Sequence, residues 1–166
     1  MAGKRDWLDA GLVLLAEQGA PAVTIERLTE RLGLSKGSFY HHFKGITGYR
    51  TALLEHFETE RTTRFVEQAE GAGEDRLIVL LSLVLAPGPG PELEIAVRAW
   101  ALQDAEARAV QERVDATRVA YLTEISGDAD LAQALYLVVV GAAQVVPPLT
   151  GRGLKNALEF VLGRRK

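Results

Sequence analysis

Residues 35–44 of this 166-residue chain read SKGSFYHHFK. All of their side chains except Gly37, Phe39 and Phe43 can donate a hydrogen bond, and none is acidic. Hydroxyls, ammonium groups and the free backbone N–H groups of a helix start are donors that bind phosphate oxygens and base edges of DNA. The missing carboxylates are informative because the whole chain has a net charge of −3. The candidate DNA-contacting residues are Thr24, Ser35, Lys36, Gly37, Ser38, Tyr40, His41, His42 and Lys44.

A first short helix must hold this run in place. Thr24 is a good N-cap for it, since a threonine hydroxyl can accept a free backbone N–H of the first turn. Ile25, Leu28 and Leu32 recur at helical spacing and form one apolar stripe. Gly33 favours a helix end, because glycine adopts the left-handed C-terminal conformation without strain.

A second short helix is predicted to carry the run itself. Ser35 is placed to cap it, and Phe39 and Phe43, four residues apart, are predicted to anchor it inward. Gly37 lets the helix start approach DNA without a Cβ in the way. The two helices and their tight turn predict a helix-turn-helix, whose second helix enters the major groove.

The segment 33–43, with Thr24-Ile25 upstream of it, resembles the DNA-binding region of the TetR family of one-component transcriptional regulators. The resemblance covers roughly the first third of the chain. It implies binding to double-stranded DNA at a pseudo-palindromic operator. Residues expected nearest the bases are Ser35, Lys36, Ser38 and His41; those expected on phosphates are Thr24, Tyr40, His42 and Lys44.

The chain departs from the family pattern just after this segment. Ile46 stands where the family commonly has a lysine, between Gly45 and Gly48. We therefore expect one phosphate contact to be missing or to be supplied by Lys44. A long helix is predicted from residue 48 to about residue 70, with Thr47 as its N-cap.

The charged residues are unevenly distributed, with a mildly basic N-terminal part and an acidic remainder. Residues 1–50 carry seven basic and five acidic side chains, and the remainder carries twelve and seventeen. Hydrophobic residues make up 48% of the chain and there are no cysteines, which excludes disulfides. No signal peptide is visible, and the apolar run 134–143 is too short to span a bilayer, so we expect a cytoplasmic protein without membrane contact.

The rest of the chain predicts further helices and no strand, so the fold class is all-α: a three-helix head over residues 1–47 and a helical effector-binding and dimerisation body over 48–166. Residues 75–86 are apolar nearly all round, which predicts a fully buried helix. In the next helix, predicted over 92–105, Arg98, Trp100 and Gln103 are candidates to line an effector pocket. The alternative, which we favour from the sequence, is that Arg98 pairs with Glu94 on an exposed strip.

The C-terminal segment 131–162 carries more apolar residues than one core requires. It reads as two helices, the first apolar around its circumference, and resembles the dimerisation face of the family, in which two helices from each subunit form a four-helix bundle. The alternative is an internal pair of core helices. Residues 164–166 are expected to be a solvated tail. The resemblance also implies a small-molecule effector that releases a dimeric repressor from its operator.

Catalytic and metal chemistry find no support in the residue pattern. His41 and His42 are neighbours and point about 100° apart on a helix, and His56 is remote in sequence. No cofactor, metal site or catalytic residue is therefore predicted, and the protein is not expected to be an enzyme. A second functional hypothesis stays open: a helical ligand-binding or protein-interaction module that has lost DNA binding, with Ile46 and its neighbouring glycines as support.

Overall fold

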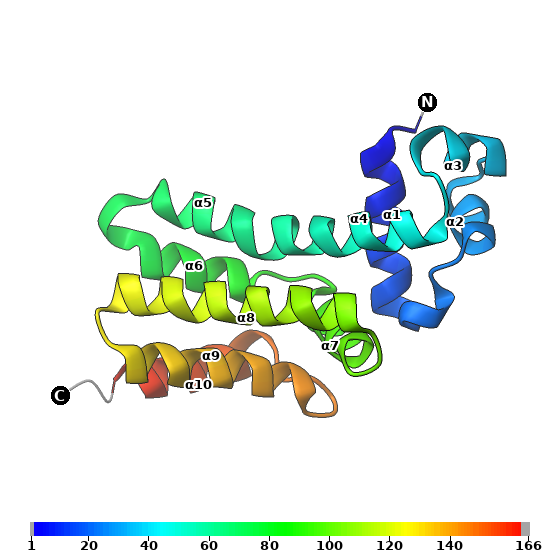
Figure 1. The fold of residues 1–166 in the computed structure, drawn as a ribbon. Coiled ribbons are helices and arrows are strands. Elements are labelled where there is room, and N and C mark those ends of the chain that lie inside the picture. The colour runs from blue at the N-terminus through cyan, green and yellow to red at the C-terminus, as the bar shows by residue number, and fades with distance from the viewer. Residues whose placement is uncertain (1, 164–166) are drawn as a thin grey trace. The chain divides into compact units, whose positions relative to one another are not determined.

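The computed structural model describes residues 2–163, and every regular element in that range is helical (Figure 1). The predicted all-α class is confirmed. The predicted tail, 164–166, lies outside the described residues. The α-helices are α1 (Lys4–Gln18), α2 (Ile25–Leu32), α3 (Lys36–His42), α4 (Ile46–Glu58), α5 (Arg64–Glu70), α6 (Arg76–Leu85), α7 (Gly90–Ala101), α8 (Ala105–Ser126), α9 (Ala129–Gln144) and α10 (Gly151–Leu162); short 3-10 turns are Ala20–Ala22 and Gly73–Asp75, and a π turn is Thr59–Thr63.

The helices form two compact units. The first unit contains Met1–Thr59 and Glu92–Gln111, and the second contains Glu60–Pro91 and Glu112–Lys166. The predicted functional division, between residues 47 and 48, stays a prediction.

The helix-turn-helix forms as its caps predict. The Arg27 backbone N–H donates to Thr24 Oγ1 at 3.3 Å, and the Ser38 N–H donates to Ser35 Oγ at 3.2 Å. Gly33 ends α2 with φ 64°, in the left-handed region that its lack of a Cβ permits. Each of the two helices therefore starts at a hydroxyl that replaces a missing backbone partner.

An aromatic cluster forms the core behind α3. Phe39 is fully buried, with its ring centroid 5.4 Å from that of Trp7 in α1 and 5.5 Å from that of Tyr49 in α4. Phe43 lies against both Phe39 and Tyr49, at 5.2 and 4.9 Å. Tyr49 is fully buried, and its hydroxyl donates to the Trp7 carbonyl oxygen at 2.6 Å. Burial, together with the nearby charge of Asp9, raises the pKa of Tyr49.

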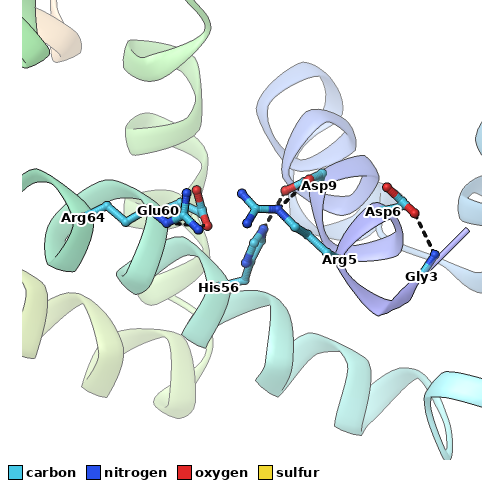
Figure 2. A network of polar contacts seen from close by, with 7 residues as sticks. All are labelled: Gly3, Arg5, Asp6, Asp9, His56, Glu60 and Arg64. Carbon is cyan, nitrogen blue, oxygen red and sulfur yellow. Dashed lines mark hydrogen bonds and ion pairs between the residues drawn. The ribbon is translucent and has the colours of Figure 1, made fainter.

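The contact between α1 and α4 is close and specific. A Cβ added at Gly11 of α1 would lie 2.0 Å from the Tyr49 hydroxyl and 2.9 Å from Leu53 Cδ1, so the two helices approach where the side chain is absent. Figure 2 shows that the Asp9 carboxylate contacts both His56 of α4 and Arg5 of α1. Its carboxylate oxygens are 2.7 Å from His56 Nε2 and 3.5 Å from Arg5 Nε.

The helix after α3 differs from its prediction at its start and in its middle. It begins at Ile46 with Gly45 as N-cap, because the Tyr49 N–H already donates to the Gly45 carbonyl at 3.0 Å. The expected cap at Thr47 was therefore wrong. The sequence predicts one helix that continues to about residue 70. In the structure a π turn at Thr59–Thr63 separates α4 from α5, and α5 ends at Glu70.

That π turn is fixed within the second unit by an arginine of α8. Thr62 is buried, and its hydroxyl accepts from Arg118 Nε at 3.0 Å. A second guanidinium N–H of Arg118 donates to the Arg61 carbonyl oxygen at 3.2 Å. Side-chain donors of this kind satisfy backbone groups that a π turn takes out of the regular helical ladder.

The core of the second unit lies where α9, α10 and α6 meet. Leu135 of α9 packs with Leu154 and Leu158 of α10, and partly buried leucines and valines of α6 cover them. The N-cap of α9 is Asp128, whose carboxylate accepts from the Leu131 N–H at 3.0 Å.

Two expectations for the middle of the chain were wrong. No residue of α6 is fully buried, and Ile78 is 64% exposed, because the chain itself covers only part of this apolar helix. α7 ends at Ala101 rather than at residue 105. Asp104, expected inside that helix, instead caps α8 by accepting from the Ala107 N–H at 2.9 Å.

Within residues 2–163, none of the helices has the length and apolar composition to cross a membrane alone; the bent pair Gly73–Leu85 and Gly90–Ala101 would meet that test by length and composition only.

Candidate nucleic-acid interface

The helix α3 divides sharply into a buried and an exposed face. Phe39 is buried in the aromatic cluster, whereas Tyr40 is 56% exposed and Lys36, Gly37 and His41 are exposed as well. Ser38 and His42 are half-buried. The fold therefore places Lys36, Tyr40 and His41 on the outside of a helix whose orientation is held by large aromatic rings.

Several of the predicted contact residues already have hydrogen-bond partners in the protein. The hydroxyl of Thr24 accepts the capping hydrogen bond of α2, although a hydroxyl can still donate to a phosphate. His42 Nε2 lies 3.2 Å from the carbonyl oxygen of Ala2, so its ring is tied to the segment before α1. Ser35 likewise accepts its capping bond while its side chain stays exposed.

The cation at the start of α3 is paired with an acid of α2. Lys36 Nζ lies 2.5 Å from Glu26 Oε1, and both side chains are well exposed. The hydrogen bond and charge of Glu26 raise the pKa of Lys36, and those of Lys36 lower the pKa of Glu26. Lys36 is thus held as a charged group at one position on the outer surface.

The two arginines of α2 are tied to α1. Arg31 donates two parallel hydrogen bonds to the carboxylate of Glu17, at 2.9 and 3.0 Å, and Arg27 donates to the Gln18 side chain. Such bidentate pairs restrict an arginine more than a single contact does. They brace α2 against α1 and leave these cations less available for DNA.

The remaining cations of this surface differ in how they are held. The Lys4 ammonium lies 5.6 Å from the centre of the Phe43 ring, and Arg50 donates to the Val23 carbonyl oxygen at 3.2 Å. Lys44 is exposed and has no ion pair or hydrogen bond of its side chain within the described part of the chain. The prediction that Lys44 supplies the phosphate contact expected to be missing at Ile46 is compatible with this exposure and stays a prediction.

Sequence reasoning missed the partners that arrange these groups. The sequence-based predictions assign no role to Glu26 or Tyr49. The spacing of Glu26 and Lys36 across a helix-turn-helix was an available signal, because the turn brings the start of α2 near the start of α3. No sequence signal pointed to the Tyr49 hydroxyl as the partner of the Trp7 carbonyl.

The three candidate effector residues lie at and beyond the end of α7. Arg98 and Trp100 are half-buried on the helix, whereas Gln103 is exposed in the turn that follows it. The Gln103 N–H donates to the Trp100 carbonyl, which places their backbones in one turn. The assignment of these residues to an effector pocket stays a prediction.

Among residues 2–163, no group of three or more histidine or acidic side chains is arranged to hold a metal ion.

Comparison with known proteins agrees with the geometry of the head. Residues 8–48 match the model of the bacterial regulatory proteins of the TetR family. Over 60 residues, the chain is 35% identical to the transcriptional regulator AcuR of Cereibacter sphaeroides. That match covers 36% of this chain and only 27% of the length of AcuR.

The likeness of fold extends over nearly the whole chain. A transcriptional regulator from Rhodococcus sp. superposes with a TM-score of 0.78 at 18% identity, covering 98% of this chain and 95% of that one. The reduced form of NemR from E. coli gives 0.75 at 20% identity, with 96% and 95% covered. A regulator from Saccharomonospora viridis, solved in complex with choline, gives 0.71 at 20% identity, with 96% and 93% covered.

Proposed function

The chain carries the N-terminal domain of the TetR family of bacterial regulatory proteins at residues 8–48, and we propose that it is a sequence-specific, DNA-binding transcriptional regulator. In this proposal α3 is the recognition helix and lies in the major groove, while α2 crosses the backbone. Ser35, Lys36, Ser38 and His41 read base edges, and Thr24, Tyr40, His42 and Lys44 bind phosphates.

One observation carries the proposal: the exposed face of α3 is rich in hydrogen-bond donors and free of acids, and a buried aromatic cluster fixes its orientation. A recognition helix must be rigid, since base readout depends on hydrogen bonds of defined geometry. The ring contacts of Phe39 with Trp7 and Tyr49 supply that rigidity from α1 and α4.

We infer that the protein acts as a homodimer through the helices of residues 131–162. Leu137 of α9 is 59% exposed and Phe160 of α10 is 61% exposed, and three further large apolar residues between these helices are exposed too: Val145, Val146 and Leu149. A second copy would cover these side chains. Two heads would then bind successive major-groove half-sites of a pseudo-palindrome about one helical turn apart or a little more.

Release by a small molecule completes the proposal. The regulator is a repressor whose effector binds the body and favours an arrangement of the heads that does not fit the operator. Effector and DNA then weaken each other's binding by the same factor. The S. viridis regulator of similar fold was solved in complex with choline, which supports small-molecule binding by a protein of this fold without naming this protein's effector.

Selection from a random double-stranded DNA library at about 150 mM salt tests this function, because non-specific contacts are weakened at that ionic strength. The expected result is enrichment of one palindromic motif, bound by a dimer. A folded, dimeric protein that enriches no motif would instead favour the alternative, a ligand-binding or interaction module that has lost DNA binding. Ile46 would then be the first residue to replace by lysine.

A further inference from the structure

An acidic side chain lies on the surface proposed to face DNA. Glu26 is the second residue of α2 and Lys36 is the first residue of α3, and their side chains, 67% and 59% exposed, meet at 2.5 Å. DNA phosphates repel a carboxylate, so Glu26 reduces general affinity for DNA. Its place in the interface therefore calls for a role other than affinity.

The ammonium of Lys36 has three N–H donors, and Glu26 uses one of them. Two donors remain, which is the number that the O6 and N7 acceptors of a guanine can take in the major groove. A phosphate bound by Lys36 would lie close to the Glu26 carboxylate, and the two negative charges would repel each other. The pair is thus compatible with a neutral base edge and poorly compatible with the DNA backbone.

We propose that Glu26 is a positioning residue that directs Lys36 to a guanine base edge and keeps it off the phosphates. The inference rests on the proposed function, which it deepens by assigning a base and a specificity determinant. It also explains why the first cation of α3 is paired while Lys44, beyond the end of the same helix, is left for the backbone.

The test compares two matched variants on the motif selected by the wild-type protein. Glu26→Gln removes the carboxylate that holds Lys36. Glu30→Gln makes the same change one turn further along α2, at another exposed glutamate. Affinities are measured for the selected duplex and for a scrambled duplex over a range of salt concentrations.

For Glu26→Gln we expect tighter binding to the scrambled duplex, a salt slope steeper by about one, and a specificity ratio reduced about tenfold. Glu30→Gln should leave that ratio unchanged, and Glu26→Asp, which keeps a carboxylate, should retain most of it. An unchanged ratio and slope for Glu26→Gln would overturn the inference.

A modified base separates positioning from a simple change of charge. Replacing single guanines of the motif by 7-deazaguanine removes the N7 acceptor, so wild-type protein should lose affinity at one guanine per half-site. Glu26→Gln should lose less there, and should have no further effect on specificity in a Lys36→Ala background. Sensitivity to 7-deazaguanine that is the same in both proteins would contradict the inference.

Failure of the inference and failure of the proposed function give different results. If the wild-type protein enriches no motif, the proposed function fails before any variant is compared. If a motif is enriched and the variants discriminate between duplexes as the wild type does, the regulator stands and the role of Glu26 is wrong.

Discussion

The aromatic cluster behind α3 and the C-terminal helices α9 and α10 differ in how far their large apolar side chains are buried. In the first unit, Trp7, Phe39 and Tyr49 have no exposed surface at all. In the second, Leu137 and Phe160 are more than half exposed, although both lie on well-formed helices. Burial of such residues is a main source of stability, so their exposure on neighbouring helices indicates an interaction surface.

The two units obtain their stability from different kinds of packing. The helix-turn-helix needs no partner to close its core, since rings from α1, α3 and α4 fill it. The C-terminal helices complete a smaller core around Leu135 and Leu158 and keep a second apolar face. In the proposed regulator, the aromatic core keeps the recognition helix α3 rigid, and the exposed apolar face of α9 and α10 joins two copies of the chain.

The largest effect is expected from removing the central ring of the head. Phe39→Ala should lower the free energy of unfolding by about 3–5 kcal/mol, because it leaves a cavity and breaks the ring contacts with Trp7 and Tyr49. Urea unfolding followed by circular dichroism measures this. Tyr40→Ala, on the exposed side of the same helix, should cost less than about 1 kcal/mol yet weaken binding to every DNA sequence. Equal destabilisation by the two variants would contradict the division of α3 into two faces.

The exposed apolar face of the second unit is tested by introducing a charge. Leu137→Glu should raise the dimer dissociation constant at least a hundredfold, because a carboxylate would have to be buried in the contact between copies. Sedimentation equilibrium measures the change. Leu102→Glu is the matched control, since Leu102 is an exposed leucine of the first unit. A Leu137→Glu protein that dimerises like the wild type would remove α9 from the proposed interface.

A smaller effect is expected where α1 and α4 touch. Gly11→Ala should destabilise the protein by about 2 kcal/mol, because the new Cβ meets the Tyr49 hydroxyl and Leu53 in a filled core. Gly48→Ala should do the opposite, gaining up to about 1 kcal/mol, since its Cβ would enter open space on a helix. Thermal unfolding distinguishes the two. A Gly11→Ala protein as stable as the wild type would show that the contact can relax without loss.

The smallest effect concerns the charges that brace α2. A double-mutant cycle on Arg31→Ala and Glu17→Ala should give a coupling free energy below about 1 kcal/mol, because the pair is half exposed to solvent. The same cycle repeated at 0.5 M salt should give less, as screening weakens exposed pairs. A coupling that is large and insensitive to salt would contradict this expectation and make the pair a main determinant of how α2 packs against α1.

The sequence by itself determined the features that depend on neighbouring residues. The caps at Thr24 and Ser35 formed as predicted, since each needs only a side-chain oxygen and a backbone N–H three residues on. The end of α2 at Gly33 and the inward position of Phe39 follow from backbone freedom and helical spacing in the same way. The all-α class and the outward face of α3 could therefore be predicted without coordinates.

Only the tertiary structure decided what depends on residues far apart in the chain. The hydroxyl of Tyr49 finds the Trp7 carbonyl 42 residues away, and no local pattern announces that partner. The pairing of Lys36 with Glu26 and the incomplete burial of α6 likewise depend on how helices are placed against one another. Sequence periodicity shows that a helix face is apolar, but how much of that face the chain itself can cover is decided by packing.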